Sequence, residues 1–252
     1  MRQQIVFIIA LILMVSCTQA ILPTGQLSHD PTLEELIFSY KTRRHAMPPL
    51  KGLMKVTIID QSHIEQGFWA KWRSRKGVVE INGYTLLGGT LFTLNMDEET
   101  ISFVSSESNF KGSRPQFQTY LMEQQDTAKM QMEWVTLLDW IARGGVPDLS
   151  LEGRLSLAEE NRQMVLSSLH ENGNLAQKLF IERGSLNVKK GIFFDSEGTL
   201  QAEMILSDYR PVQRSAQKTF FPFYIQTKVQ DRVDQKIRQM EIVFKELKVM
   251  AE

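Results

Sequence analysis

The 252-residue sequence carries no net charge and almost no cysteine. Its 29 lysines and arginines balance 29 aspartates and glutamates, so no strong electrostatic field attracts nucleic acid. The single cysteine, Cys17, excludes an internal disulfide and a cysteine-rich zinc site. With 42% hydrophobic residues, the chain is long enough to bury a real core. We therefore expect a folded protein that does not bind nucleic acid.

Catalytic motifs are lacking as well. The four histidines do not have metal-ligand spacing, and no GxSxG, HExxH, phosphate-binding glycine loop or CxxC occurs. The two acidic pairs, 98–99 and 159–160, fall where turns are expected. Adjacent carboxylates in turns are more typical of solvated charge than of a glycosidase pair. The sequence therefore predicts neither an enzyme nor a bound cofactor or metal.

The long hydrophobic run that is present stands at the start of the chain. Eleven apolar residues, 5–15, follow Arg2. At about 1.5 Å per residue they are too short for a hydrocarbon core of about 30 Å. A signal-peptide core is therefore expected in place of a permanent membrane helix.

Ser16 and Cys17 end this run and resemble a bacterial lipobox, in which the cysteine is acylated and becomes the new N-terminus. Ordinary cleavage after Ala20, which would discard Cys17, is the alternative. Acylation would anchor the protein, since each buried methylene contributes about 0.8 kcal/mol and more than one chain makes attachment stable. We expect a lipoprotein signal peptide (1–16), an acylated cysteine with its tether (17–29) and a single domain (30–252). Thr18, in place of aspartate, is compatible with the outer membrane.

Beyond the tether, the apolar residues first recur at helical spacing and then at every second position, which is typical of strands. Thr32 and Glu35 have capping-box spacing, and the two prolines at 48–49 end the helix that they begin. Antiparallel strands are then expected, with hairpin turns at 97–99, 172–173 and 197–198. Residues 110–120 are interpreted as irregular, and 132–143 as an amphipathic helix that must cover an apolar surface. The expected strands are 50–60, 67–75, 78–85, 90–96, 100–106, 163–170, 175–183, 188–195, 200–208, 220–229 and 236–249.

One loop interrupts the strand alternation within residues 77–104. It contains Leu86 and Leu87, followed by two glycines, and no catalytic residue type. We expect these leucines to face solvent, which suits a loop that handles apolar partners. A leucine packed on its own hairpin is the alternative.

Three motifs, in this order, resemble those of LolB-like outer-membrane lipoprotein receptors and the wider LolA/LolB superfamily. Residues 87–94 (LGGTLFTL) resemble a Leu-Gly-Ser-Thr strand entry, and 138–147 (LDWIARGGVP) a Leu-x-x-Trp-Leu-x-Gly-x-Pro segment. Residues 221–225 (FPFYI), with a closing strand at 237–247, are similar to the superfamily's C-terminal part. The Asn-Pro that precedes the loop leucine in the family is absent here.

The resemblance implies an α+β, mainly β fold: an incomplete antiparallel half-barrel with helices covering its open concave side. Its apolar concave face would take acyl chains of lipoproteins or lipids, and Leu87 would match the leucine associated with delivery into the membrane. The implied partners are the membrane, through the N-terminal acyl anchor, a lipoprotein or lipid cargo and a periplasmic LolA-like carrier. A monomer on the periplasmic side of a bacterial outer membrane is expected.

Apolar side chains at strand or helix spacing are the candidates for the ligand-binding face. The alternation of apolar and polar residues does not show which set of alternate side chains points inward. For each residue, packing in the protein core without any ligand contact is the alternative. A structural or assembly lipoprotein that binds a membrane-protein partner without carrying lipid is the alternative function. Basic residues 73, 75–76 and 189–190 either contact anionic lipid headgroups or form the solvent-facing side of strands. The ligand-binding candidates are Met54, Val56, Ile58, Phe68, Trp72, Ile81, Leu91, Leu94, Phe103, Trp134, Leu138 and Ile141.

Overall fold

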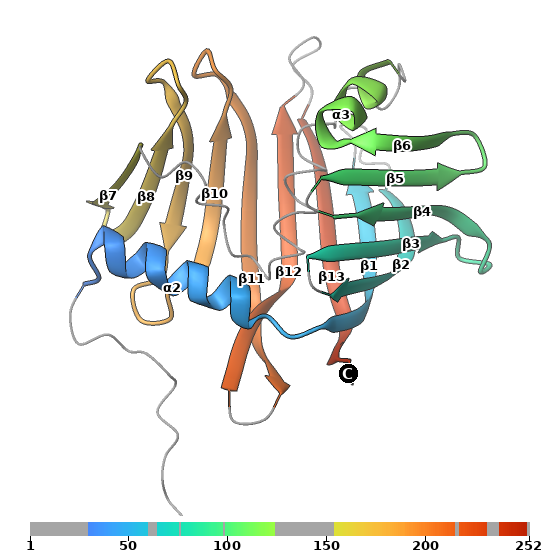
Figure 1. Cartoon of the computed structure of the whole chain (residues 1–252), viewed down its shortest axis with the longest axis horizontal. Helices are drawn as coiled ribbons and strands as arrows, with labels where there is room; N and C mark the ends of the chain where they lie inside the picture. Colours follow the sequence, from blue (N-terminus) through green and yellow to red (C-terminus); the bar gives the residue numbers. More distant parts are fainter. Residues whose placement is uncertain are drawn as a thin grey trace, which may run out of the picture.

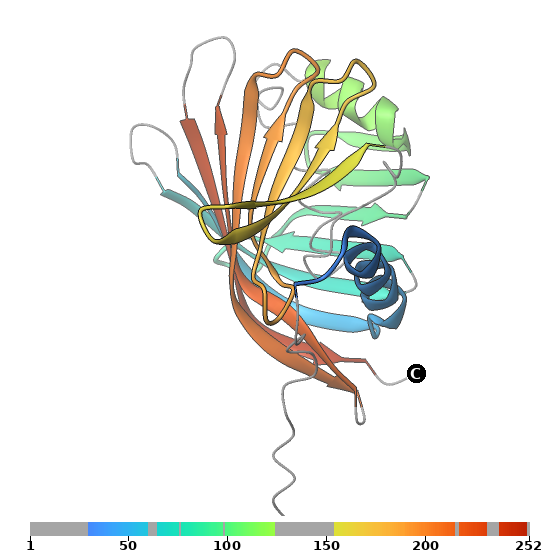
Figure 2. The same cartoon turned by 90° about the vertical axis from the view of Figure 1, so that its left-hand side faces the viewer.

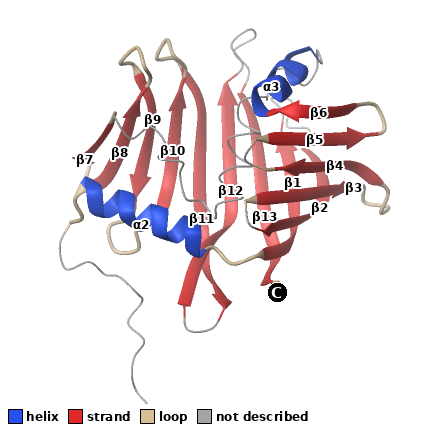
Figure 3. Ribbon diagram, in the orientation of Figure 1, coloured by secondary structure: helices blue, strands red, loops and turns tan. Residues whose placement is uncertain are grey.

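The computed structural model describes residues 30–59, 65–75, 77–97, 99–123, 154–214, 217–230 and 237–250. Strands dominate this part of the chain, and two helices accompany them (Figure 3). The helices are α2 (Leu33–Ala46) and α3 (Arg114–Glu123). The strands are β1 (Leu50–Ile59), β2 (Glu65–Arg75), β3 (Val78–Tyr84), β4 (Thr90–Met96), β5 (Thr100–Ser105), β6 (Asn109–Ser113), β7 (Leu155–Glu160), β8 (Gln163–Leu169), β9 (Leu175–Ile181), β10 (Val188–Phe194), β11 (Leu200–Arg214), β12 (Gln217–Gln230) and β13 (Ile237–Val249).

All strands belong to one antiparallel sheet with the order β6-β5-β4-β3-β2-β1-β13-β12-β11-β10-β9-β8-β7. Two meanders are joined in the middle, where β1 pairs with β13 through partners such as Val56 and Ile242. A sheet with so many twisted strands curls. Figures 1 and 2 show β2–β6 turned across the direction of β8–β12, so the sheet is strongly curved and does not close into a barrel. The predicted incomplete half-barrel is confirmed.

Helix α2 begins with the predicted capping box. The Thr32 hydroxyl accepts a hydrogen bond from the Glu35 amide at 3.2 Å, and the Glu35 carboxylate accepts one from the Thr32 amide at 2.8 Å. Acidic residues in the first turn and basic residues in the last turn complement the helix dipole. The helix runs across β8–β11 (Figure 1) and buries Leu36 and Tyr40. Among the residues that the structure describes, neither α2 nor α3 could span a bilayer.

The prediction that residues 110–120 are irregular is wrong. Phe110 lies in β6, where it pairs with Phe103 of β5, and α3 follows directly. A second capping box begins α3, because the Ser113 amide donates to Gln116 Oε1 at 2.8 Å and the Gln116 amide donates to Ser113 Oγ at 3.4 Å. Pro115 fits the first turn of this helix. The Ser-x-x-Gln spacing was therefore a readable signal.

The acidic pair at 159–160 lies in a strand and not in a turn. β7 ends at Glu160, and the turn comes one step later at Asn161 and Arg162, whose φ angles are 50° and 65°. Ion pairs hold both carboxylates, Glu160 to Lys178 at 2.7 Å and Glu159 to Arg183 at 2.8 Å. The other predicted strands are confirmed, with β11 and β12 longer than expected. The leader, the tether and the predicted helix at 132–143 lie outside the described residues.

Candidate functional site

Alternate side chains of neighbouring strands form one continuous apolar inner face. Strand pairing aligns a first row across five strands, from β2 through β1, β13 and β12 to β11. Each member of this row is apolar, and the three in the middle are almost completely buried. The row consists of Phe68, Val56, Ile242, Ile225 and Leu206.

A second row continues the inner face along the other half of the sheet. It crosses β2 to β6 through direct partners in the register: Trp72, Ile81, Leu94, Phe103 and Phe110. Most residues next to these positions, such as Arg73 and Asn95, are polar and point to the opposite face. The structure thus settles which strand parity faces inward.

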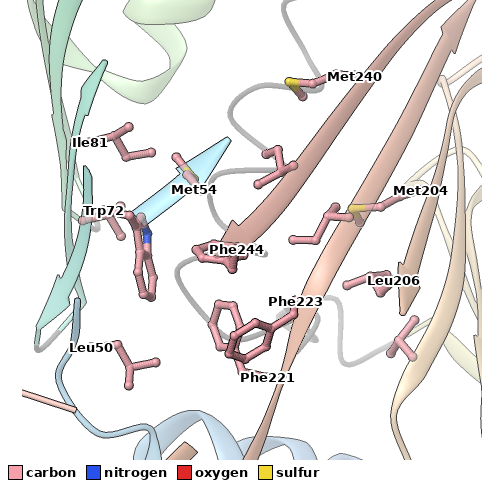
Figure 4. Close-up of a cluster of buried hydrophobic side chains, with 14 of the residues drawn as sticks. Leu50, Met54, Trp72, Ile81, Met204, Leu206, Phe221, Phe223, Met240 and Phe244 are labelled. Carbon is pink, nitrogen blue, oxygen red and sulfur yellow. The ribbon is translucent and has the colours of Figure 1, made fainter. Parts of the chain in front are cut away.

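Aromatic rings gather where the two rows meet. The Trp72 ring lies 5.5 Å from that of Phe221 and 5.6 Å from that of Phe244, and the two phenylalanine rings are 5.2 Å apart. Figure 4 shows Trp72 on β2 facing these phenylalanines across the interior. Ring pairs at such distances add specific contacts to the burial of apolar area. This cluster joins β2 to β12 and β13.

A second aromatic cluster lies under α3. Phe110 is 5.1 Å from Phe117 and 4.8 Å from Tyr120, so both helix residues pack on β6. Phe92 extends the cluster toward Phe103, at 5.9 Å. Space for the Phe92 ring depends on Gly83, since a Cβ there would lie 2.5 Å from Phe92 Cε1. Helix α3 therefore covers one end of the inner face.

The sequence-predicted ligand-binding candidates divide into three groups. Those within the described strands belong to the inner face, with the exception of Leu91, and their role in binding remains a prediction. Leu91 is 38% exposed and falls at the register shift between β3 and β4, so placing it on this face was wrong. Trp134, Leu138 and Ile141 lie outside the described residues. The candidates that lie on the inner face and pack in its apolar cluster are Met54, Val56, Ile58, Phe68, Trp72, Ile81, Leu94 and Phe103.

The wall opposite these candidates was not predicted. β11, β12 and β13 contribute it, and apolar residues such as Ile205, Phe220 and Val243 interrupt their alternation with polar residues. The alternation in 221–225 was a usable signal, but the sequence does not show that this strand faces Trp72. The missed residues are Met204, Leu206, Phe221, Phe223, Ile225, Met240, Ile242 and Phe244.

Polar contacts fix α2 to the connection between β9 and β10. Tyr40 donates a hydrogen bond to the Leu186 carbonyl at 3.1 Å, and Arg43 donates to the same carbonyl at 3.2 Å and to that of Ser185. Burial raises the pKa of the Tyr40 and Tyr209 hydroxyls, so both stay neutral. Burial also lowers the pKa of the Arg43 guanidinium. These groups hold the helix in place across the sheet.

The loop between β3 and β4 holds its two leucines away from the protein. The Thr85 amide donates to the Gly89 carbonyl at 2.8 Å, the Gly88 amide to the Thr85 carbonyl at 3.0 Å, and Gly88 adopts a φ of +88°. Within this turn Leu86 is 80% exposed and Leu87 is 100% exposed. The prediction of solvent-facing leucines is confirmed, and the alternative, a leucine packed on its own hairpin, is wrong for Leu87.

Basic side chains of the strands form ion pairs, with Arg73 and Lys190 on the opposite parity to the inner face and Lys189 at the register shift of β10. Arg73 lies 3.5 Å from Glu80, Lys190 lies 2.9 Å from Glu203, and Lys189 lies 3.3 Å from Glu182. This arrangement agrees with the second expectation, that these basic residues form the solvent-facing side of the strands. Residue 76 lies outside the described part of the chain.

Known proteins match this chain through structure and not through sequence. Neither a protein-family model nor a curated protein matches the sequence. A LolA superfamily protein of Nitrosomonas europaea superposes with a TM-score of 0.55 at 9% identity, covering 88% of this chain and 95% of that one. An outer membrane lipoprotein-sorting protein domain of Vibrio parahaemolyticus gives 0.56 at 10% identity, with 86% and 92% covered. A DUF1329 family protein of Desulfovibrio piger gives 0.54 at 8% identity, with 88% and 94% covered.

These likenesses span nearly the whole of each neighbour and establish the fold. The chain has an open half-barrel similar to those of a LolA superfamily protein and a lipoprotein-sorting domain. The names of the first two neighbours refer to that superfamily and to lipoprotein sorting, and not to catalysis. The predicted resemblance is confirmed at the level of fold.

Proposed function

We propose that this protein is a lipid-anchored carrier of the bacterial envelope. It holds acyl chains of lipoproteins or lipids against its inner face and helps to localise them in the outer membrane. The observation that carries this proposal is the continuous apolar inner face, which crosses the sheet from β6 to β11 in a fold shared with lipoprotein-sorting domains. Acylated Cys17 and residues 17–29 tether the single domain 30–252 to the periplasmic side of the membrane.

Lipid transfer needs no catalytic residue on this face. Burial of apolar surface contributes about 25 cal/mol per Å², and an acyl chain gains a similar amount in a bilayer. Moving the chain from one apolar environment to another is therefore close to neutral in free energy. A monomer that accepts cargo from a periplasmic LolA-like carrier could release it into the membrane without another energy source.

The loop leucines give the carrier its contact with the membrane. Leu86 and Leu87 expose apolar side chains at the tip of a tight turn. A bilayer would bury both without a change in the fold of the turn. Their place between β3 and β4, next to the second inner row, puts membrane contact beside the ligand-binding face.

Photocrosslinking from adjacent residues of β5 tests lipid binding directly. Phe103 lies on the inner face, whereas its neighbour Val104 is exposed on the outer face. With p-benzoylphenylalanine in place of each, radiolabelled acyl lipid should be captured from position 103 and not from position 104. Equal capture at both positions, or capture at 104 alone, would contradict the proposal.

A partner-binding envelope lipoprotein without lipid cargo is the second candidate. The exposure of Leu86 and Leu87 favours it, because apolar side chains in solvent suit a protein partner as well as a membrane. This function predicts that the crosslinker at Phe103 captures no lipid, while one at Leu87 captures a membrane protein.

A further inference from the structure

Trp72 carries a buried hydrogen-bond donor without an acceptor among the described residues. Its side chain is completely buried on the inner face, and in the described part of the chain its indole Nε1 has no hydrogen-bond partner. Buried indole N–H groups normally find an acceptor, because an unpaired donor in an apolar interior is costly. The donor is therefore available to an acceptor that the described residues do not supply.

Apolar residues of the described strands lie against Trp72. The rings of Phe221 and Phe244 lie against the indole, and Gly52 and Ile81 are its partners on the two adjacent strands. Figure 4 shows the indole directed from β2 toward the interior where these phenylalanines lie. A ligand that occupies this interior would bring its own polar atoms to the indole.

We propose that Trp72 Nε1 donates a hydrogen bond to the carbonyl oxygen of an ester-linked or amide-linked acyl chain. This inference rests on the proposed function, lipid binding, and names the chemical class of the ligand. A neutral carbonyl matches a single neutral donor. An ionised carboxylate would need a cation to offset its burial, and the ring cluster supplies only apolar side chains. The face thus selects neutral acyl esters and amides over both plain alkanes and ionised fatty acids.

A second buried group on the same face agrees with a ligand that has polar atoms. Thr227 of β12 is buried between Met204 and Met240, its partners on the adjacent strands, and its hydroxyl has no hydrogen-bond partner within the described ranges. A hydroxyl can both donate and accept, so it discriminates less than the indole. Trp72 is therefore the residue that sets the preference for a carbonyl.

A conservative substitution separates the donor from the ring. Trp72→Phe keeps an aromatic side chain and removes the N–H, and Trp69→Phe makes the same change on the outer parity of β2. The full chain, kept in solution by amphipol, is titrated with two fluorescent probes of equal chain length. One is the methyl ester of a pyrene-labelled fatty acid, and the other is the corresponding alkylpyrene, which has no carbonyl.

Trp72→Phe removes one neutral hydrogen bond and should therefore raise the dissociation constant of the ester probe about fivefold. Alkylpyrene binding should stay within about twofold of wild type, and Trp69→Phe should change neither. Because Trp72→Phe also shrinks a fully buried ring, it should lower the melting temperature of the ligand-free protein, so the difference between the two probes reports the hydrogen bond and the melting temperature does not.

Three results would overturn the inference. Equal weakening for both probes would assign Trp72 to packing alone. Unchanged ester binding would show that the N–H does not reach the ligand and would assign it to the Phe244 ring, which stands at 76° to the indole. If the wild-type chain binds neither probe, lipid carriage itself is refuted, and this inference with it.

Discussion

Replacing Leu87 by alanine should weaken membrane association without weakening the fold. The side chain is 100% exposed, so it contributes nothing to packing within the protein. The substitution removes three carbons, and at about 0.8 kcal/mol for each buried carbon the loss is about 2.4 kcal/mol if the leucine inserts fully. That loss corresponds to a roughly 50-fold weaker partition into the bilayer.

The assay is flotation with liposomes, using the form that begins at Thr18 so that no acyl anchor masks the loop. Phe38→Ala is the matched control, because Phe38 is also exposed, at 72%, but lies on α2. It should partition like wild type. The free energy of unfolding of both variants should stay within about 0.5 kcal/mol of wild type. Unchanged partition for Leu87→Ala would refute the loop assignment, and a loss confined to Phe38→Ala would move the membrane contact to α2.

Three further predictions concern the framework of the site. Tyr40→Phe removes the hydrogen bond to the Leu186 carbonyl and should lower the free energy of unfolding by about 1 kcal/mol in urea titration; no loss would refute this contact. Gly83→Ala places a Cβ 2.5 Å from the Phe92 ring and should cost about 1–3 kcal/mol, whereas Gly67→Ala, whose nearest neighbour lies 3.6 Å away, should cost less; equal costs would contradict the packing. Hydrogen bonds from Thr100 hold the pKa of Asp97 below its ordinary 3.8, so the stabilisation exists above that value and is lost as pH falls through the lower folded pKa. Asp97→Asn should therefore lower the melting temperature at pH 7, and the difference from wild type should vanish in strong acid; a difference that persists there would exclude the ionised carboxylate as its cause.

Local chemistry made much of the fold predictable. The Thr32 and Glu35 capping box is contained within four residues, and both of its hydrogen bonds form. Strand alternation and turn residues such as Gly173, with a φ of +88°, likewise depend on near neighbours in sequence. The prediction for 110–120 failed because β6 forms by pairing with β5 and because the local capping spacing of Ser113 and Gln116, which begins α3, was overlooked.

The ligand-binding face could be predicted only in part, because strand pairing assembles it across the chain. Val56 meets Ile242 across the β1–β13 junction, a contact between the two ends of the sequence that a local period does not reveal. Leu91 was misplaced because a register shift at Gly83 and Tyr84 breaks the alternation that the prediction assumed. The unpaired indole of Trp72 is likewise a property of its surroundings, since the sequence shows only another aromatic residue in a strand.

The most direct test of the central claim is mass spectrometry of the lipid bound to this protein. The form that begins at Thr18 would be purified from a bacterial periplasm without detergent and extracted with organic solvent. Lipid carriage predicts that acyl lipid or acylated peptide is released in amounts comparable to the protein, and that labelled acyl lipid replaces it on incubation. A protein that is free of lipid after purification and takes up no labelled lipid would contradict the account.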